Sequence, residues 1–186
     1  PFTFRSDTID IHFSFNKQGQ ISGIYVDSYA SSHKISPRLP NDQELVIGSE
    51  PWRLSASLTL PEGDGPFPAV ILLQDFGPSD RNEQIGPNLP FYDLAEQLSK
   101  QGIAVLRYDK RTYTYANEML GADEMTVYDE IIDDAVSAYT QLSAITQIDP
   151  QRIYLLGHGF GGTVMPLVAD KLPETAGYIL LAAPAR

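Results

Sequence analysis

The chain contains no cysteine among its 186 residues. This absence excludes disulfides, thiolate metal ligands and a cysteine nucleophile, although it does not decide the compartment. Long hydrophobic runs are absent too, since no apolar stretch approaches the ~18 residues that a membrane-spanning helix needs. We therefore expect no membrane partner.

Positive charge is scarce as well. Thirteen lysines and arginines stand against 24 acidic residues, which gives a formal net charge of −11. A nucleic-acid partner is therefore not expected, because such a partner requires basic surface. Hydrophobic residues make up 42% of the chain, which is typical of a globular domain with a sizeable core. The chain begins at Pro1 without a signal peptide, so we expect a processed or trimmed product.

The first 30 residues follow the pattern of a β-hairpin. Apolar and polar residues alternate over 9–15, residues 16–20 have the composition of a turn, and a second strand is predicted over 21–29. A hairpin alone is only marginally stable, so this one must pack on other structure. Residues 31–43, which include Pro37 and Pro40, are predicted to be a linker.

From residue 44 onwards, strand patterns alternate with helix patterns. This alternation predicts an α/β fold, with a mostly parallel sheet between two helical layers and right-handed crossovers. An antiparallel pair is expected to open the sheet. Strands are predicted over 44–48, 53–60, 69–73, 103–108 and 152–156, and helices over 91–98, 126–142 and 163–171.

The predicted helix over 126–142 carries four carboxylates in its first half, and Thr126 can cap it. The helix dipole favours anions at this end, so we interpret these residues as a solvated acidic face. A metal site is the alternative interpretation, but we expect no bound metal. The four residues are Asp129, Glu130, Asp133 and Asp134.

Residues 157–161 read Gly-His-Gly-Phe-Gly between a predicted strand and a predicted helix. The spacing is that of G-x-S-x-G, in which a nucleophilic serine sits on a tight strand-to-helix turn. Here the middle residue is Gly159, so the turn is present without its nucleophile. We expect a positive φ at Gly159, because the elbow residue is strained and glycine adopts such angles without a Cβ penalty.

Several stretches in order, together with this elbow, resemble the α/β-hydrolase superfamily. The similarity covers residues 54–186 and is greatest to bacterial serine esterases of the dienelactone-hydrolase or acyl-peptidase type. It implies a sheet that is incomplete at its C-terminal side, and a chain that is truncated and lacks the catalytic serine. The stretches that carry it are 67–73, 77–83, 102–111 and 180–186.

The resemblance assigns roles to three positions. Gly159 takes the place of the nucleophile, and the backbone N–H groups of Phe76 and Phe160 are the nominal oxyanion donors. The family usually has His-Gly after the strand over 69–73, whereas this chain has Gln74-Asp75. Asp75 either faces the hole, where it would repel an oxyanion, or points to solvent.

The general base of the family is not found among the histidines of this chain. His12 lies in the predicted hairpin and His33 in the predicted linker. His158 is the variable residue of the elbow, and we expect its side chain to point away from the attack site. In the family, the acid and the histidine follow the sixth strand, which here means beyond Arg186.

The resemblance therefore implies a protein that is catalytically inactive as the chain stands and that binds a small ester-like ligand without a cofactor. Aromatic residues would bound its pocket: Phe76, Tyr108, Phe160 and either Tyr113 or Tyr115. One alternative is an active carboxylic-ester hydrolase whose serine was changed and whose C-terminal part is missing from this chain. The other is a non-catalytic interaction module that pairs through a sheet edge.

The run that begins at Gly177 and ends at Ala183 carries no charge and is expected to form this edge. A flat apolar edge promotes aggregation unless it is covered, so we expect a second copy or a partner chain there. The hairpin over 1–30 resembles the closing hairpin of a small α+β accessory domain that precedes some members of the group. The resemblance also suggests a periplasmic or secreted protein.

Overall fold

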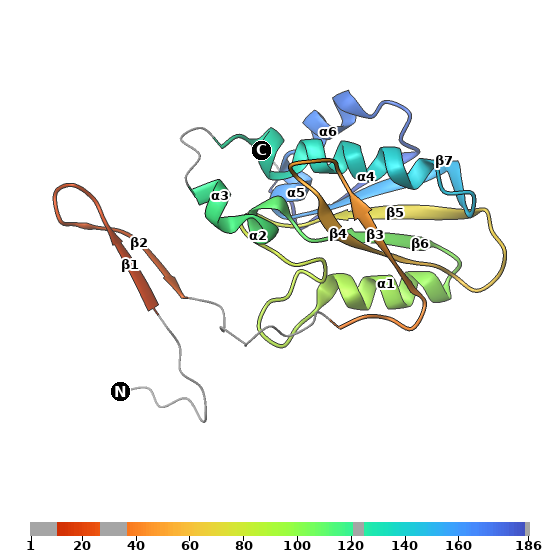
Figure 1. Ribbon diagram of the computed structural model, residues 1–186, viewed down its shortest axis with the longest axis horizontal. Coiled ribbons are helices and arrows are strands. Elements are labelled where there is room, and N and C mark those ends of the chain that lie inside the picture. The colour runs from red at the N-terminus through yellow and green to blue at the C-terminus, as the bar shows by residue number, and fades with distance from the viewer. Residues whose placement is uncertain (1–10, 27–36, 121–124, 185–186) are drawn as a thin grey trace. The chain divides into compact units, whose positions relative to one another are not determined.

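The computed structural model describes residues 11–26, 37–120 and 125–184 (Figure 1). The chain divides into two compact units. One comprises residues 1–35 with 85–88, and the other comprises 36–84 with 89–186. His33 and residues 31–36 of the predicted linker lie outside the described residues.

The first unit contains a β-hairpin. Strand β1 (Ile11–Phe15) pairs in antiparallel fashion with β2 (Ile21–Val26). The turn between them is closed by Asn16, whose Oδ1 accepts hydrogen bonds from the N–H groups of Gln18 and Gln20 at 3.0 and 2.9 Å. Asparagine favours turns because its short side chain can make such bonds to the following backbone. His12 lies in β1.

The second unit is built on a six-stranded mixed sheet, which confirms the predicted α/β fold. Its order is β3-β4-β6-β5-β7-β8. The pairs β3–β4 and β4–β6 are antiparallel, and β6, β5, β7 and β8 run parallel. The strands are β3 (Asp42–Ile47), β4 (Leu54–Thr59), β5 (Phe67–Leu73), β6 (Ala104–Tyr108), β7 (Ile148–His158) and β8 (Gly177–Leu181).

Helices cover both faces of this sheet (Figure 1). Helix α1 (Pro90–Lys100) lies on one face, and α4 (Asp133–Ser143) and α6 (Met165–Lys171) lie on the other. Among the described residues, no helix is long and apolar enough to span a membrane. The remaining helical elements are α2 (Arg111–Thr114), α3 (Ala116–Leu120), the π-helical turn η1 (Tyr128–Ile132) and α5 (Phe160–Thr163).

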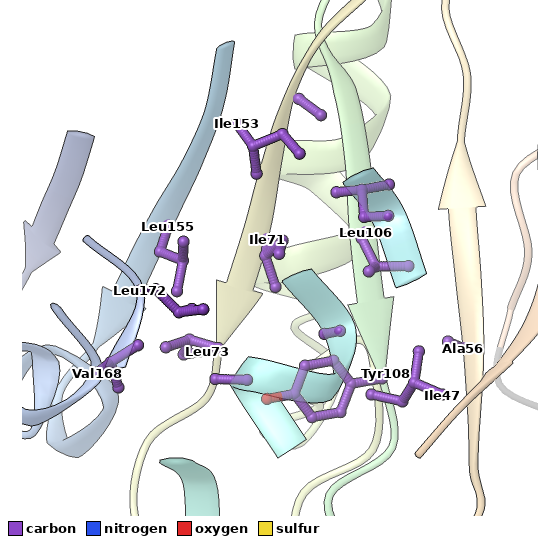
Figure 2. Packing of buried hydrophobic residues seen from close by; sticks show 14 of the residues in the cluster. Ile47, Ala56, Ile71, Leu73, Leu106, Tyr108, Ile153, Leu155, Val168 and Leu172 are labelled. Atoms are coloured by element: carbon purple, nitrogen blue, oxygen red, sulfur yellow. The ribbon is translucent and has the colours of Figure 1, made fainter. Parts of the chain in front are cut away.

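Strand β5 is apolar throughout, which is typical of a strand covered on both faces. Along β5, Ile71 and Leu73 pack towards α4 and α6, whereas Val70 and Leu72 pack towards α1. Figure 2 shows the first of these two layers, in which Tyr108 at the end of β6 joins the aliphatic side chains. The parallel strands therefore end together at one edge, where the elbow and the loop after β5 meet.

Two predicted boundaries are wrong. The helix predicted over 163–171 is divided into α5 and α6, which meet at Val164. Pro166 explains the division, because proline has no N–H to donate and is tolerated only in the first turn of a helix. The predicted linker over 31–43 extends too far, since β3 begins at Asp42 and Leu39 is already buried.

The solvated acidic face predicted for residues 129–134 is wrong for two of its four carboxylates. Glu130 and Asp134 are buried. Glu130 pairs with Lys110, and Asp134 Oδ1 lies 2.6 Å from Arg111 Nη2. Both basic residues follow β6, so the acidic turn covers the end of that strand instead of facing water.

Thr126 does not cap the helix in the predicted way. Its hydroxyl and its N–H both donate to Asp129 Oδ2, at 2.7 and 3.0 Å. The carboxylate of the first turn therefore satisfies the backbone that precedes the helix. These bonds lower the pKa of Asp129 from its ordinary value.

Asp134 makes the stability of the protein depend on pH. Burial raises the pKa of Asp134 to about 6, and the hydrogen bond from Arg111 offsets only part of this effect. Between the ordinary value of 3.8 and about 6, the folded protein therefore binds more protons at this site than the unfolded chain does. The contribution of Asp134 to stability consequently falls as the pH rises through this window.

We predict that Asp134→Asn removes this pH-dependent contribution to stability. The stability of the wild type relative to Asp134→Asn should decline as the pH rises through the window, which urea unfolding at a series of pH values measures. The exposed Asp93 on α1 offers a control, and Asp93→Asn should show the pH dependence of the wild type. Parallel curves for the wild type and Asp134→Asn would contradict the prediction.

Candidate functional site

The elbow lies between β7 and α5, at the carboxyl end of a parallel strand. Gly159 has φ 52° and ψ −113°, in the positive-φ region that the elbow requires. The flanking glycines allow close backbone approach, since a Cβ at Gly157 would lie 2.5 Å from Gly161 O and one at Gly161 would lie 2.6 Å from Leu73 O. The turn therefore has the form that would present a nucleophile, although residue 159 has no side chain.

The two nominal oxyanion donors both point at one side-chain oxygen of Asp75. The N–H groups of Phe76 and Phe160 donate to Asp75 Oδ1 at 2.7 and 2.6 Å. The sequence left open whether Asp75 faces the hole or solvent. The structure places its carboxylate on the two donors, while the residue itself is exposed to solvent.

The carboxylate also fills the space in front of Gly159. A Cβ added at Gly159 would lie 2.5 Å from Asp75 Oδ2 and closer still to Cγ and Oδ1. Real Cβ atoms essentially never approach another heavy atom this closely. A side chain at position 159 and the carboxylate of Asp75 are therefore mutually exclusive in this arrangement.

The backbone of Asp75 is held on both sides. Its N–H donates to Glu83 Oε1 at 2.7 Å, and its carbonyl oxygen accepts from Lys110 Nζ at 2.9 Å. Lys110 also pairs with Glu130, whose Oε1 accepts the N–H of Gly77 at 3.2 Å. The start of the loop after β5 is thus tied to one buried carboxylate later in the same loop and to two buried charged side chains from other segments.

His158 belongs to the same network. Its Nδ1 lies 2.9 Å from Glu83 Oε1, the atom that also accepts the Asp75 N–H. The imidazole is therefore engaged with the loop that carries Glu83. This contact gives the variable residue of the elbow a structural role.

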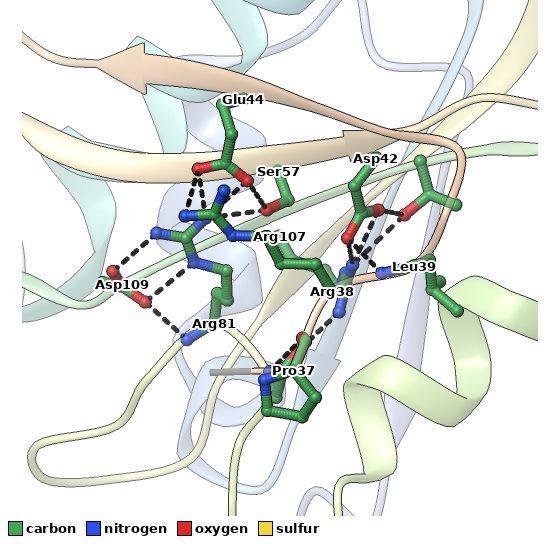
Figure 3. A network of polar contacts seen from close by, with 11 residues as sticks. Pro37, Arg38, Leu39, Asp42, Glu44, Ser57, Arg81, Arg107 and Asp109 are labelled. Carbon is green, nitrogen blue, oxygen red and sulfur yellow. Dashed lines mark hydrogen bonds and ion pairs between the residues drawn. The ribbon is translucent and has the colours of Figure 1, made fainter. Parts of the chain in front are cut away.

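The loop that carries Glu83 is anchored by a polar network (Figure 3). The guanidinium of Arg81 lies 2.9 Å from Asp109 Oδ2 and 3.1 Å from Glu44 Oε2. Arg107 Nη2 lies 2.8 Å from Asp42 Oδ2, and its Nη1 donates to the side chain of Asn82. These contacts hold the loop in place while Glu83 adopts a φ of 51°, which is strained for a residue with a Cβ.

The charge of Asp75 is stabilised where it lies. Burial raises its pKa, but the hydrogen bonds from Phe160 and Phe76, together with the nearby charges of His158 and Lys110, outweigh this effect and lower the pKa below the ordinary value. Asp75 is therefore a carboxylate at neutral pH. A second negative oxygen would have to enter the hole against this charge.

The aromatic pocket predicted from the sequence does not form as a group. The rings of Phe76 and Phe160 meet edge to face with centroids 5.5 Å apart. Tyr108 lies in the core, because alternation along β6 directs it towards α4. Tyr113 is exposed, and Tyr115 packs against Trp52 at 5.1 Å, so neither is part of the Phe76–Phe160 pair.

Sequence reasoning missed Glu83, Lys110 and Glu130 as residues of the site. Glu83 and Lys110 lie inside stretches that carried the family resemblance, which was the available signal. Glu130 had no such signal, because its partner is distant in the sequence. In the part of the chain that the structure describes, no group of three or more histidine or acidic side chains could hold a metal ion.

Comparisons with known proteins bear on the fold that carries this site. The family model described as serine aminopeptidase, S33, matches residues 90–186, which is 97 of the 186 residues. Esterase EstD of Thermotoga maritima is 33% identical over 192 residues, which cover the whole chain and 44% of EstD. The chain therefore spans less than half the length of this relative.

Solved structures show the same fold. Est1E from Butyrivibrio proteoclasticus superposes with a TM-score of 0.55 and 18% identity, over 75% of this chain and 51% of that one. The 2,6-dihydroxy-pseudo-oxynicotine hydrolase gives a TM-score of 0.52 and 22% identity, over 72% of this chain and 34% of that one. At these identities, the likeness concerns the fold alone.

The exclusion between positions 75 and 159 predicts a strong coupling of stability. Gly159→Ser should destabilise the protein by about 2–4 kcal/mol, because the new side chain overlaps Asp75 and adopts a positive φ. In an Asp75→Ala background the cost should fall by about 1–3 kcal/mol, since only the backbone strain remains. Urea unfolding of the four proteins in this double-mutant cycle measures the difference.

Gly102 provides the control for backbone strain. Its φ is 82°, and an added Cβ would meet nothing within 4 Å. Gly102→Ser should therefore cost the same with and without Asp75→Ala. Additive effects of Asp75→Ala and Gly159→Ser would show that the two positions do not share one space.

Proposed function

The chain belongs to the serine aminopeptidase (S33) family of α/β-hydrolases, and from this premise we propose that it keeps the esterase fold without hydrolysing esters. In this proposal, any remaining activity of the site is the binding of a small ester-like ligand. The observation that carries the proposal is the Asp75 carboxylate, which lies where a nucleophile and an oxyanion would otherwise meet.

Magnitudes support a loss of catalysis. Removal of the catalytic serine in this type of mechanism lowers turnover by about 10⁶-fold and leaves roughly 10³–10⁴ over water, which the oxyanion hole and substrate binding supply. Here Gly159 provides no oxygen, and Asp75 Oδ1 accepts both donors of the hole. The rate enhancement that the serine would provide is therefore lost, and so is much of the smaller enhancement that the oxyanion hole would supply.

This argument does not depend on residues beyond Arg186. An acid and a histidine elsewhere could activate a serine, but they could not supply the missing oxygen at position 159. The nearest hydroxyl along the chain is that of Thr163, at the end of α5. It donates to Gly159 O at 3.1 Å and is therefore occupied by the turn.

The second candidate is an active carboxylic-ester hydrolase in which the serine has been replaced. Two observations favour it: the elbow keeps its backbone form, and the relative EstD is an esterase. Under this alternative, a serine at position 159 should restore reactivity once the space in front of it is free. The geometry adds a requirement that the sequence did not indicate, namely removal of the Asp75 side chain.

We predict that the wild-type protein neither hydrolyses p-nitrophenyl acetate above the buffer rate nor reacts with a fluorophosphonate probe. The same should hold for Gly159→Ser, because the serine side chain and the Asp75 carboxylate compete for the space in front of residue 159, so the hydroxyl does not reach a free hole. Labelling is detected by mass spectrometry after the probe is removed.

The double variant Asp75→Ala/Gly159→Ser, produced from the complete gene, separates the two candidates. If the introduced serine at position 159 is labelled, the site is that of an esterase with two replaced residues. If it stays unlabelled while the protein is folded, the loss extends beyond the two positions. Turnover by the wild type would contradict the proposal directly.

The third candidate is an interaction module that pairs through β8. This strand is the last in the sheet order, and its side chains Ile179, Leu180 and Leu181 are exposed. Such an edge offers unpaired backbone groups and apolar surface to another chain. We propose that a second copy of the chain covers it.

Light scattering tests this pairing. The wild type should be dimeric at high concentration, and Leu180→Lys should be monomeric because it places a charge in the contact. Leu167→Lys is the control, since Leu167 is also an exposed leucine but lies on α6. A stable monomer of the wild type at high concentration would contradict the pairing.

A further inference from the structure

We propose that Asp75 is a tethered ligand of the hole formed by the Phe76 and Phe160 N–H groups. The chain closes its own anion-binding site with an internal carboxylate, and a free carboxylate binds there only once that side chain is removed. The inference rests on the proposed function in treating the hole as the former oxyanion site, and it places any ligand that the wild type binds outside the hole.

The first step is the form of the contact. Two N–H groups from separate segments, the loop after β5 and the start of α5, converge on Asp75 Oδ1 at 2.7 and 2.6 Å. Such convergence on one oxygen is how an oxyanion is held, and hydrogen bonds to an ionised acceptor are shorter and stronger than neutral ones. Asp75 thus makes the contacts that an external carboxylate would make.

The second step is that the arrangement is built into the fold. Asp75 is held by its own N–H on Glu83 and by its carbonyl oxygen on Lys110, and the exposed fractions of these partners are 3% and 1%. Moving the residue would break bonds to buried charged groups, which costs more than the loss of exposed bonds. The backbone therefore directs the carboxylate towards the two donors.

The third step is competition for the same space. Asp75 Oδ2 lies where the Cβ and side chain of residue 159 would be, directly in front of Gly159. An external carboxylate that placed one oxygen between the donors would need this volume. It would also meet a like charge, because the two N–H groups favour the ionised form of Asp75.

A titration with acetate tests the proposal in the whole chain. Nitrogen-15 NMR follows the backbone amides of Phe76 and Phe160 as acetate is added. The wild type should show no saturable shift of either amide. In Asp75→Ala both amides should shift together and reach saturation with acetate, but not with uncharged acetamide.

Two further variants test whether the Asp75 carboxylate itself prevents acetate binding. Asp75→Asn keeps a carbonyl oxygen on the two donors, so it should bind acetate about tenfold or more weakly than Asp75→Ala does. Asp64→Ala removes an exposed carboxylate before the start of β5, whereas Asp75 follows its end. Asp64→Ala should behave like the wild type, which excludes a general effect of net charge.

The proposal is wrong if the wild type and Asp75→Ala respond equally to acetate, or if folded Asp75→Ala does not respond. If Asp75→Ala does not fold, Asp75→Gly removes the same carboxylate and is titrated instead. A failure of this proposal is distinguishable from a failure of the proposed function. Ester turnover by the wild type would contradict inactivity, and an absent acetate response in an inactive protein would contradict the tethered ligand alone.

Discussion

The buried polar loop between β5 and α1 is the constraint on which the site depends. Four consecutive residues, Asp80 to Glu83, have exposed fractions of 6% or less. Buried charges destabilise a protein unless they are paired, so each side chain has to meet a partner at a defined place. Strands β3, β4 and β6 and the segment after β6 supply four of these partners, which are Glu44, Ser57, Arg107 and Asp109. The other two are the N–H of Asp75, at the start of the same loop, and His158 of the elbow.

This pairing determines what the candidate site can do. Because Glu83 accepts the N–H of Asp75 and also contacts His158, the loop after β5 and the elbow are held at a set separation. In a serine esterase the same arrangement would direct two donors at a developing oxyanion. Here it directs them at a carboxylate that is already negative, so the polarity of the site is satisfied before any ligand arrives.

Much of the fold could be predicted from the sequence, because burial imposes a pattern on strands and helices. The apolar run over 69–73 lies in β5 and is buried on both faces, and the glycine spacing over 157–161 marks a strand-to-helix turn. The acidic turn at 129–134 was misjudged for a physical reason. Periodicity shows which residues share a face, but it does not show that Lys110 and Arg111 stand opposite two of them.

The same distinction between local sequence pattern and tertiary contact holds for the candidate site. The sequence by itself determined that position 159 has no nucleophile and that the turn around it is tight, since both follow from local residue types and backbone sterics. Only the tertiary structure decided that Asp75 enters the hole. That outcome depends on Glu83 of the same loop and on Lys110 and Phe160, which lie 35 and 85 residues away in the sequence. A pattern of neighbouring residues carries no record of such contacts.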